Sequence, residues 1–293
     1  MNYTEQGLVF ECQGESLVGV LAVPEQAQNV GVVIIVGGPQ YRIGSHRQFV
    51  LLARNLAENG FPCLRFDNRS MGDATGETRD FEDIGPDLAA AVSEFFAALP
   101  DVQHVVLLGL CGGASAACVY APEDDRIKGL LLLNPWVRTA ESQAKAYLKH
   151  YYADRLRDPA FWKKLFKGKI GVASALTGVA RTARKAIGKT KVQDPQSERN
   201  GAGSTLMERM LYGVERSCSS SLVVLSGRDY VARECDEVLI PHPRFKDLAV
   251  KGRVRVMRVD EADHTFTMPG LQQELERITV DFVRSLSLDV GAR

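Results

Sequence analysis

Residues 105–117 read VVLLGLCGGASAA, and the organisation of the whole chain is best understood outward from this stretch. An apolar run too short for a typical helix meets a Gly-x-Cys-x-Gly pentad at Gly109–Gly113, and small residues that tolerate a helix follow it. The pattern predicts a strand, a sharp turn and a helix. Because glycines on both sides let the chain pack closely around a strained residue, we expect the Cys111 side chain to stand clear of the sheet edge.

Cys111 is therefore a candidate nucleophile. The positive end of the following helix, with its free N–H groups, favours a thiolate over a thiol at this position. A structural role is the alternative, because free cysteine is among the most buried residue types and fits a tight strand-to-helix turn. Side chains elsewhere in the sequence have to decide between the two roles.

Composition narrows the class of protein. The 293 residues include 36 Lys or Arg and 36 Asp or Glu, so the net charge indicates no nucleic-acid partner, and we expect none. No apolar run approaches the roughly 20 residues that cross a bilayer, and the N-terminal residues do not form a basic and apolar leader, which predicts a cytoplasmic protein. Six scattered cysteines without a CxxC pair predict neither a disulfide framework nor a metal site, and we expect no cofactor.

Apolar runs alternate with helical patterns through most of the chain, after a hairpin predicted at residues 8–23. The run Val30–Val36 is typical of strands buried on both faces of a parallel sheet. The predicted core strands are residues 30–36, 61–67, 105–110, 127–133, 221–226 and 253–259, and the predicted helices are 45–60 with Ser45 as N-cap, 81–99, 112 onward, 232–239 and 270–286. The alternation predicts an α/β fold with a mainly parallel central sheet flanked by helices.

The pattern changes after Trp136. No strand-like run occurs from about residue 140 to 188, where helical patterns follow one another, and residues 189–205 are rich in polar residues and glycine. We interpret residues 1–136 and 221–293 as the core, and residues 137–220 as an inserted helical cap with a flexible loop near 189–205. The cap carries an excess of basic residues, which form either a solvated helix face or a surface for an acyl carrier or a membrane.

Three reactive side chains follow the ends of three separate predicted strands, in the order Cys111, Asp229 and His264. This is the chain order of nucleophile, acid and base in one class of catalytic triad. Asp229 would orient the His264 imidazole, which would deprotonate Cys111 and later protonate the leaving group. Asp260 and Asp263 are alternatives to Asp229 as the acid, although they would have to turn back onto the loop of His264.

An acyl-transfer site also needs N–H donors for the developing oxyanion. The backbone N–H of Gly112, directly after Cys111, is one candidate. The second comes from the loop after residue 36, where Pro39 has no N–H and the donor is therefore Gly38 or Gln40. The candidate substrate-lining residues are Tyr41, Trp136, Tyr147, His150 and Tyr151.

The chain resembles the α/β-hydrolase superfamily in five motifs, which are GGP (37–39), RFDNRSMGD (65–73), GLCGG (109–113), SGRD (226–229) and DHTF (263–266). It resembles more narrowly the exosortase A system-associated hydrolases, type 1, in VGGPQYR (36–42), GSHRQF (44–49), LNPWVR (133–138) and AYLKHYY (146–152). This resemblance covers nearly the whole chain. It implies an α/β-hydrolase fold and a role near exopolysaccharide or envelope biosynthesis, and it leaves the substrate open.

The residues and the resemblance together favour hydrolysis of an ester or thioester through an S-acyl intermediate on Cys111, with a small-molecule or carrier-bound acyl substrate. Transfer of the acyl group to an alcohol or amine with the same triad is the second hypothesis. A third, from another class, is a binding protein that keeps the fold without catalysis. The oligomeric state stays open.

Overall fold

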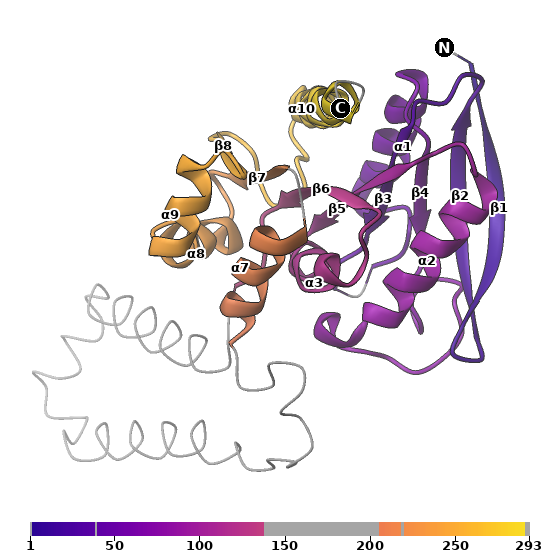
Figure 1. Cartoon of the computed structure of the whole chain (residues 1–293), viewed down its shortest axis with the longest axis horizontal. Coiled ribbons are helices and arrows are strands. Elements are labelled where there is room, and N and C mark those ends of the chain that lie inside the picture. Colours follow the sequence, from indigo (N-terminus) through magenta and orange to yellow (C-terminus); the bar gives the residue numbers. More distant parts are fainter. Residues whose placement is uncertain (1, 39, 138–204, 218–219, 291–293) are drawn as a thin grey trace, which may run out of the picture. The chain divides into compact units, whose positions relative to one another are not determined.

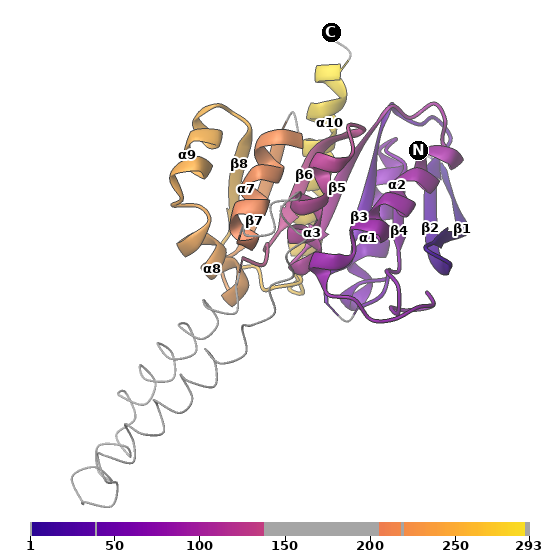
Figure 2. The same ribbon diagram turned by 60° about the horizontal axis from the view of Figure 1, so that its bottom comes forward.

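A computed structural model describes residues 2–38, 40–137, 205–217 and 220–290. Apart from residues 205 and 206, this part of the chain forms one compact unit. Its eight strands make a single sheet of order β1-β2-β4-β3-β5-β6-β7-β8 (Figure 2). The strands are β1 (Tyr3–Cys12), β2 (Glu15–Pro24), β3 (Val30–Ile35), β4 (Cys63–Phe66), β5 (His104–Leu110), β6 (Ile127–Leu133), β7 (Ser220–Ser226) and β8 (Val254–Val259).

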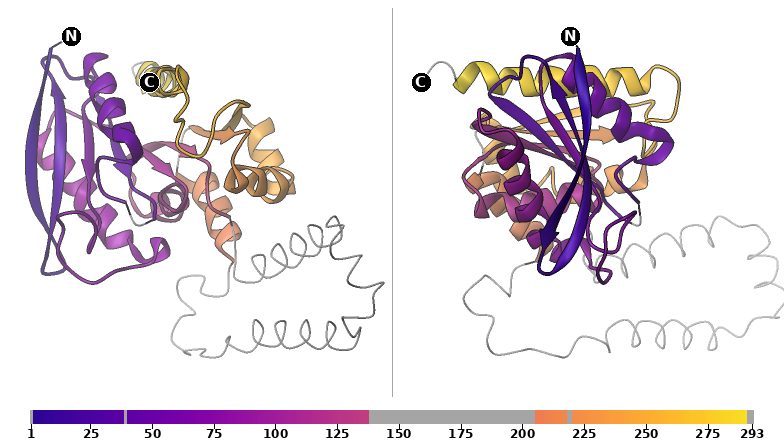
Figure 3. Two further views of the ribbon diagram at one scale, coloured as in Figure 1. Left: turned by 180° about the vertical axis from the view of Figure 1, so that it is seen from behind. Right: turned by 90° about the vertical axis from the view of Figure 1, so that its right-hand side faces the viewer.

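The sheet is parallel from β4 to β8 and antiparallel only at the β1–β2 edge. Gln13 and Gly14 join β1 to β2, and both have positive φ, 55° and 84°, as a two-residue hairpin turn requires. Figure 3 shows this hairpin as the outer edge of the sheet. The predicted hairpin and the mainly parallel sheet are confirmed.

Helices cover both faces of the sheet (Figure 1). Apolar side chains of α1 and α10, among them Leu52 and Phe282, share one buried cluster with the strands on the first face. On the other face α2 packs against α3, and α7 packs on α3 so closely that a Cβ on Gly213 would lie 1.8 Å from the Cys118 carbonyl oxygen. The helices are α1 (Gln48–Glu58), α2 (Gly85–Ala98), α3 (Gly112–Tyr120), α7 (Leu206–Ser217), α8 (Tyr230–Val238), α9 (Pro243–Val250) and α10 (Leu271–Val290).

The predicted start of the first helix was wrong. The α-helix begins at Gln48 and not at Ser45, because His46 and Arg47 have positive φ of 43° and 66° and so leave the right-handed helical region. The helix predicted over 81–99 is a short 3₁₀ turn, η2 (Phe81–Asp83), followed by α2. Helix α9 was not predicted at all.

The predicted cap lies mostly outside the described residues, which resume at residue 205. Tyr147, His150 and Tyr151 fall in that stretch, so their assignment to the substrate pocket stays a prediction. Among the helices that the structure describes, none is both long and apolar enough to cross a lipid bilayer.

Candidate active site

Cys111 lies in a strained turn between β5 and α3. Its φ of 57° and ψ of −123° are a combination that a non-glycine residue rarely adopts and that costs about 1–3 kcal/mol. Main-chain hydrogen bonds hold it there: its N–H donates to the Leu133 carbonyl of β6 at 2.9 Å, and its own carbonyl accepts from the Ala114 N–H at 3.0 Å. The side chain is only partly buried, beside the apolar core.

Two glycines of the pentad are required by the close approach of backbone to backbone. A Cβ on Gly109 would lie 2.4 Å from the Ala114 nitrogen, and one on Gly113 would lie 2.5 Å from the Ile35 carbonyl oxygen. Gly112 differs, because a Cβ there would meet the Phe81 ring at 3.1 Å, a side chain that can shift. The turn is thus fixed by main-chain contacts on the β5 and β3 sides.

Asp229 caps α8 and also binds His264. Its carboxylate accepts from the N–H groups of Val231 at 3.3 Å and Ala232 at 3.1 Å, and Oδ2 lies 2.8 Å from the His264 Nδ1 atom. Burial opposes ionisation of this carboxyl, but the hydrogen bond and charge of His264 outweigh it and hold the Asp229 pKa below its ordinary value. Asp229 therefore stays charged next to the imidazole.

His264 connects the carboxylate to the sulfur. The hydrogen bond that His264 donates to the Asp229 carboxylate raises the pKa of His264 to about 10, a second hydrogen bond with Cys111 contributes, and burial opposes the rise. The imidazole is accordingly protonated at neutral pH. The structure thus brings Cys111, His264 and Asp229 together, in the order that the sequence predicts.

Asp263 was an alternative acid, and its carboxylate lies elsewhere. It accepts from the Thr267 N–H at 2.8 Å and forms a short hydrogen bond with the Thr267 hydroxyl. In the described part of the chain, the carboxylate that meets His264 Nδ1 is that of Asp229.

The loop after β3 lies against the elbow, where an oxyanion would form. A Cβ on Gly37 would lie 2.6 Å from the Gly113 nitrogen and 3.0 Å from the Gly112 nitrogen, so the two backbones are in contact. The Gln40 N–H donates within its own loop, to the Gly38 carbonyl at 2.8 Å. Of the two candidate second donors, Gln40 therefore has its N–H engaged within the loop, and the assignment of Gly38 stays a prediction.

A buried ion pair that the sequence analysis missed anchors this loop. The Arg42 N–H donates to Asp67 Oδ1 at 2.6 Å, and its guanidinium pairs with Oδ2 of the same carboxylate, which is fully buried after β4. The guanidinium also reaches Asp73 at 2.7 Å. Arg42 and Asp67 lie in two of the motifs that carry the family resemblance. No other feature of the sequence pointed to these two residues.

Two predicted substrate-lining residues are described. Tyr41 is 44% exposed, on the loop that carries Gly38. Trp136 contacts the elbow through its backbone: its N–H donates to the Cys111 carbonyl at 3.3 Å, and its carbonyl accepts from the Ser115 hydroxyl at 2.5 Å. These contacts fix the Trp136 backbone at the elbow.

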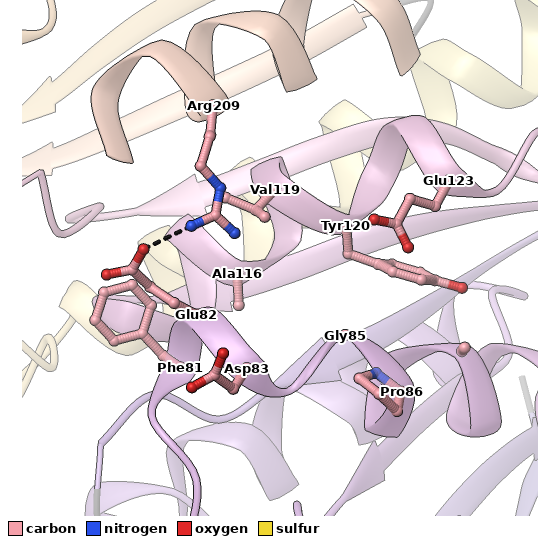
Figure 4. A pocket seen from close by; sticks show the side chains of 11 residues that line it. Phe81, Glu82, Asp83, Gly85, Pro86, Ala116, Val119, Tyr120, Glu123 and Arg209 are labelled. Atoms are coloured by element: carbon pink, nitrogen blue, oxygen red, sulfur yellow. Dashed lines mark hydrogen bonds and ion pairs between the residues drawn. The ribbon is translucent and has the colours of Figure 1, made fainter. Parts of the chain in front are cut away.

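A pocket of about 370 Å³ runs along α3 (Figure 4). It starts next to the elbow, because the Phe81 ring that borders it packs against Gly112. Arg209 of α7 reaches across it and pairs with Glu82 at 2.6 Å. The lining residues are Phe81, Glu82, Asp83, Gly85, Pro86, Ala89, Ala116, Val119, Tyr120, Glu123 and Arg209.

No group of three or more His, Cys, Asp or Glu side chains in the described ranges is arranged to hold a metal ion. The Cys111 thiol and the His264 imidazole are groups that serve in nucleophilic attack and proton transfer.

Comparisons with known proteins agree with this architecture. The sequence model of a family described as the alpha/beta hydrolase fold matches residues 31–199. Similar solved structures include an esterase of Pyrococcus furiosus (16% identity, TM-score 0.63, 97% of this chain and 91% of that one) and a dienelactone hydrolase of Anabaena variabilis (13%, 0.60, 96% and 97%). An alpha/beta hydrolase of a Penicillium species, GrgF, is also similar (17%, 0.59, 97% and 99%). A comparison with curated protein sequences finds no match.

Proposed function

The chain belongs to the alpha/beta hydrolase fold family, and from this and the geometry at Cys111 we propose that it cleaves an ester or thioester through a covalent S-acyl intermediate. The observation that carries the proposal is the position of His264, whose imidazole is hydrogen-bonded to the Asp229 carboxylate and to the Cys111 sulfur. That arrangement matches the nucleophile, base and orienting group of a triad. The esterase-like fold of several similar structures supports the hydrolase assignment.

The first half-reaction follows from the protonated state of His264. The Cys111 thiolate attacks the substrate carbonyl carbon, and a C–S bond forms as the carbonyl electrons move to oxygen. The tetrahedral oxyanion then collapses, the bond to the leaving group breaks, and the His264 imidazolium gives its proton to the departing oxygen or sulfur. The products are S-acyl Cys111, a neutral imidazole and the free alcohol or thiol.

The second half-reaction reverses these roles. Neutral His264 takes a proton from water as the water oxygen attacks the thioester carbon, and the Cys111 thiolate leaves as the acid product forms. Asp229 keeps the imidazole oriented in both steps without itself accepting the proton. In both half-reactions the N–H groups of Gly112 and Gly38 would donate hydrogen bonds to the oxyanion. One such donor lowers the barrier of a typical acyl transfer by about 3 kcal/mol.

A sulfur nucleophile favours activated acyl donors. Thiolates attack thioesters readily, and the acyl-enzyme keeps the activation of the original thioester. The resemblance to exosortase-associated hydrolases directs the search for the natural donor toward exopolysaccharide and envelope biosynthesis.

Trapping of the intermediate tests the proposal. The purified chain is mixed with short p-nitrophenyl esters or with acyl-CoA thioesters, quenched in acid and digested for mass spectrometry. We expect the acyl mass on the peptide that contains Cys111, and loss of turnover in Cys111→Ala and His264→Ala. Cys235→Ala is the matched control, because that thiol is buried within α8. An acyl group on another peptide, or full turnover in Cys111→Ala, would refute the mechanism.

Acyl transfer to an amine is the second candidate. The carboxylates of Asp83 and Glu123 border the pocket beside the elbow, and negative charge there would attract a protonated amine from solvent. If the enzyme is a transferase, added primary amines will divert the acyl group from acid to amide product, and neutral alcohols will do so less well. Acid as the sole product at all amine concentrations would identify a hydrolase.

A further inference from the structure

The end of β6 contacts the elbow on one side. The Leu133 carbonyl accepts the Cys111 N–H at 2.9 Å, and the Trp136 N–H donates to the Cys111 carbonyl at 3.3 Å. The residues between them, Asn134 and Pro135, are therefore held next to the nucleophile by main-chain hydrogen bonds on either side. The mechanism proposed above uses none of these four residues.

The Asn134 side chain contacts the acid and base side of the site. Its Oδ1 accepts the Ser226 N–H at 2.8 Å, and its Nδ2 donates to the Ser226 hydroxyl at 2.9 Å and to the His264 carbonyl at 3.1 Å. Ser226 ends β7, three positions before Asp229. One amide thus ties the strand that carries the acid to the loop that carries the base.

The burial and the backbone conformation of Asn134 make the loss of these hydrogen bonds costly. The residue is fully buried, so an amide atom that lost its protein partner would also be shielded from solvent. Its φ is 44°, in the left-handed region that asparagine tolerates better than most residues. The conformation directs an amide with two donated and one accepted hydrogen bond toward Ser226 and His264.

We propose that Asn134 is a positioning residue that sets the place of the His264 loop relative to Asp229 and Cys111. The catalytic part of this inference rests on the proposed function. The structural part, that Asn134 sets the position of the His264 imidazole relative to the Cys111 sulfur, can be tested without a substrate. Without the amide, the His264 carbonyl loses its hydrogen bond to the end of β6. The Arg228 N–H still binds the Ala262 carbonyl at 2.9 Å, so the loop stays attached beyond β7, but the imidazole is set less closely against the Cys111 sulfur.

Asn134→Gly is the principal test, because glycine adopts positive φ without strain and removes only the side chain. Site-resolved mass spectrometry measures the rate of Cys111 alkylation by iodoacetamide across pH in the full chain. We expect the rate at neutral pH to fall on the order of tenfold to a hundredfold, since a displacement of about 1 Å has effects of this size. The dependence of this rate on pH should differ from that of the wild type, and kcat should fall with KM little changed.

Two further variants separate positioning from general loss of stability. Asn134→Asp keeps the size and the acceptor for Ser226 but gives up at least one donated hydrogen bond, and it should show the same change if Asn134→Gly does not fold. Thr279→Ala is the matched control: it removes a buried hydroxyl that donates to the Leu275 carbonyl within α10. Its melting temperature should fall while the alkylation profile stays that of the wild type.

The outcomes distinguish this inference from the proposed function. A wild-type alkylation profile in both Asn134 variants would overturn the positioning role, as would an equal change of profile in Thr279→Ala. If the wild-type chain forms no acyl-Cys111 with any donor, the proposed function fails, and the alkylation profiles still decide the role of Asn134.

Discussion

The nucleophile side and the acid–base side of the site are built in different ways. Around Cys111 the contacts are main chain to main chain, and the space beside Gly109 and Gly113 admits no side chain. Around His264 the contacts are made by side chains from distant positions, Asp229 at a separation of 35 residues and Asn134 at 130. The comparison teaches that substitutions of the glycines around Cys111 should cost mainly stability, and substitutions of the side chains around His264 mainly chemistry.

The largest expected effect is on the acid–base side, in Asp229→Asn. Asparagine can still cap α8, so any fall in melting temperature should come from the lost interaction with His264 and not from the helix. The imidazole loses the carboxylate that raises its pKa, and kcat/KM should fall by roughly three to four orders of magnitude, as in other triads. Steady-state kinetics and thermal unfolding measure the two effects.

The control for this variant is Asp263→Asn, which changes a neighbouring carboxylate that binds Thr267. It should keep kcat/KM within a few-fold of the wild type. An equal loss in both variants would mean that the comparison between the two sides, with Asp229 as the acid, is wrong.

The second effect belongs to the nucleophile side. In Gly109→Ala the new methyl group would lie 2.4 Å from the backbone of Ala114, and the forced shift should lower the free energy of unfolding by about 1–3 kcal/mol or more. Gly112→Ala meets only the movable ring of Phe81 and keeps its N–H, so its loss should be smaller. Denaturant unfolding of the pair gives the difference, and equal losses would contradict a turn fixed by backbone contacts.

The pH dependence gives a third and smaller effect. Because the His264 pKa is raised to about 10, the imidazolium that protonates the leaving group persists through neutral pH, and turnover should decline only as pH rises through about 10. The sign for stability is the same: the interaction with Asp229 contributes fully below pH 6.5 and is lost as pH rises through the folded pKa. In Asp229→Asn the decline of turnover at high pH should begin at a lower pH. If it begins at the same pH as in the wild type, Asp229 does not set the pKa of His264.

The smallest effect is expected in the pocket beside the elbow. Phe81→Leu shortens the side chain that packs on Gly112 and borders the pocket, so KM should change by a few-fold, in line with the small energy of a few methylene groups, and kcat should change less. Phe96→Leu is the matched control, because Phe96 packs against Phe95 and the Arg126 guanidinium instead. Equal changes of KM in the two variants would mean that this pocket is not part of the substrate-binding site.

Local patterns allowed much of the fold to be predicted. Apolar runs of strand length alternate with amphipathic segments, and this predicts a parallel sheet flanked by helices, which the structure confirms. The boundaries that failed were set by backbone conformation: His46 and Arg47 have positive φ, so α1 starts at Gln48 and not at Ser45. The amphipathic pattern of residues 45–60 gives no sign of these two positive φ angles.

The sequence by itself determined the elbow at Cys111 and the order of the candidate acid and base, because a glycine-flanked turn and a strand end are local features. Only the tertiary structure separated Asp229 from Asp263, showed the Gln40 N–H bound within its own loop, and brought Asn134 to the His264 loop. These contacts depend on distances of a few ångströms between carboxylate, N–H and amide groups that belong to different loops. Such distances exist only once the sheet has brought the strand ends to one edge.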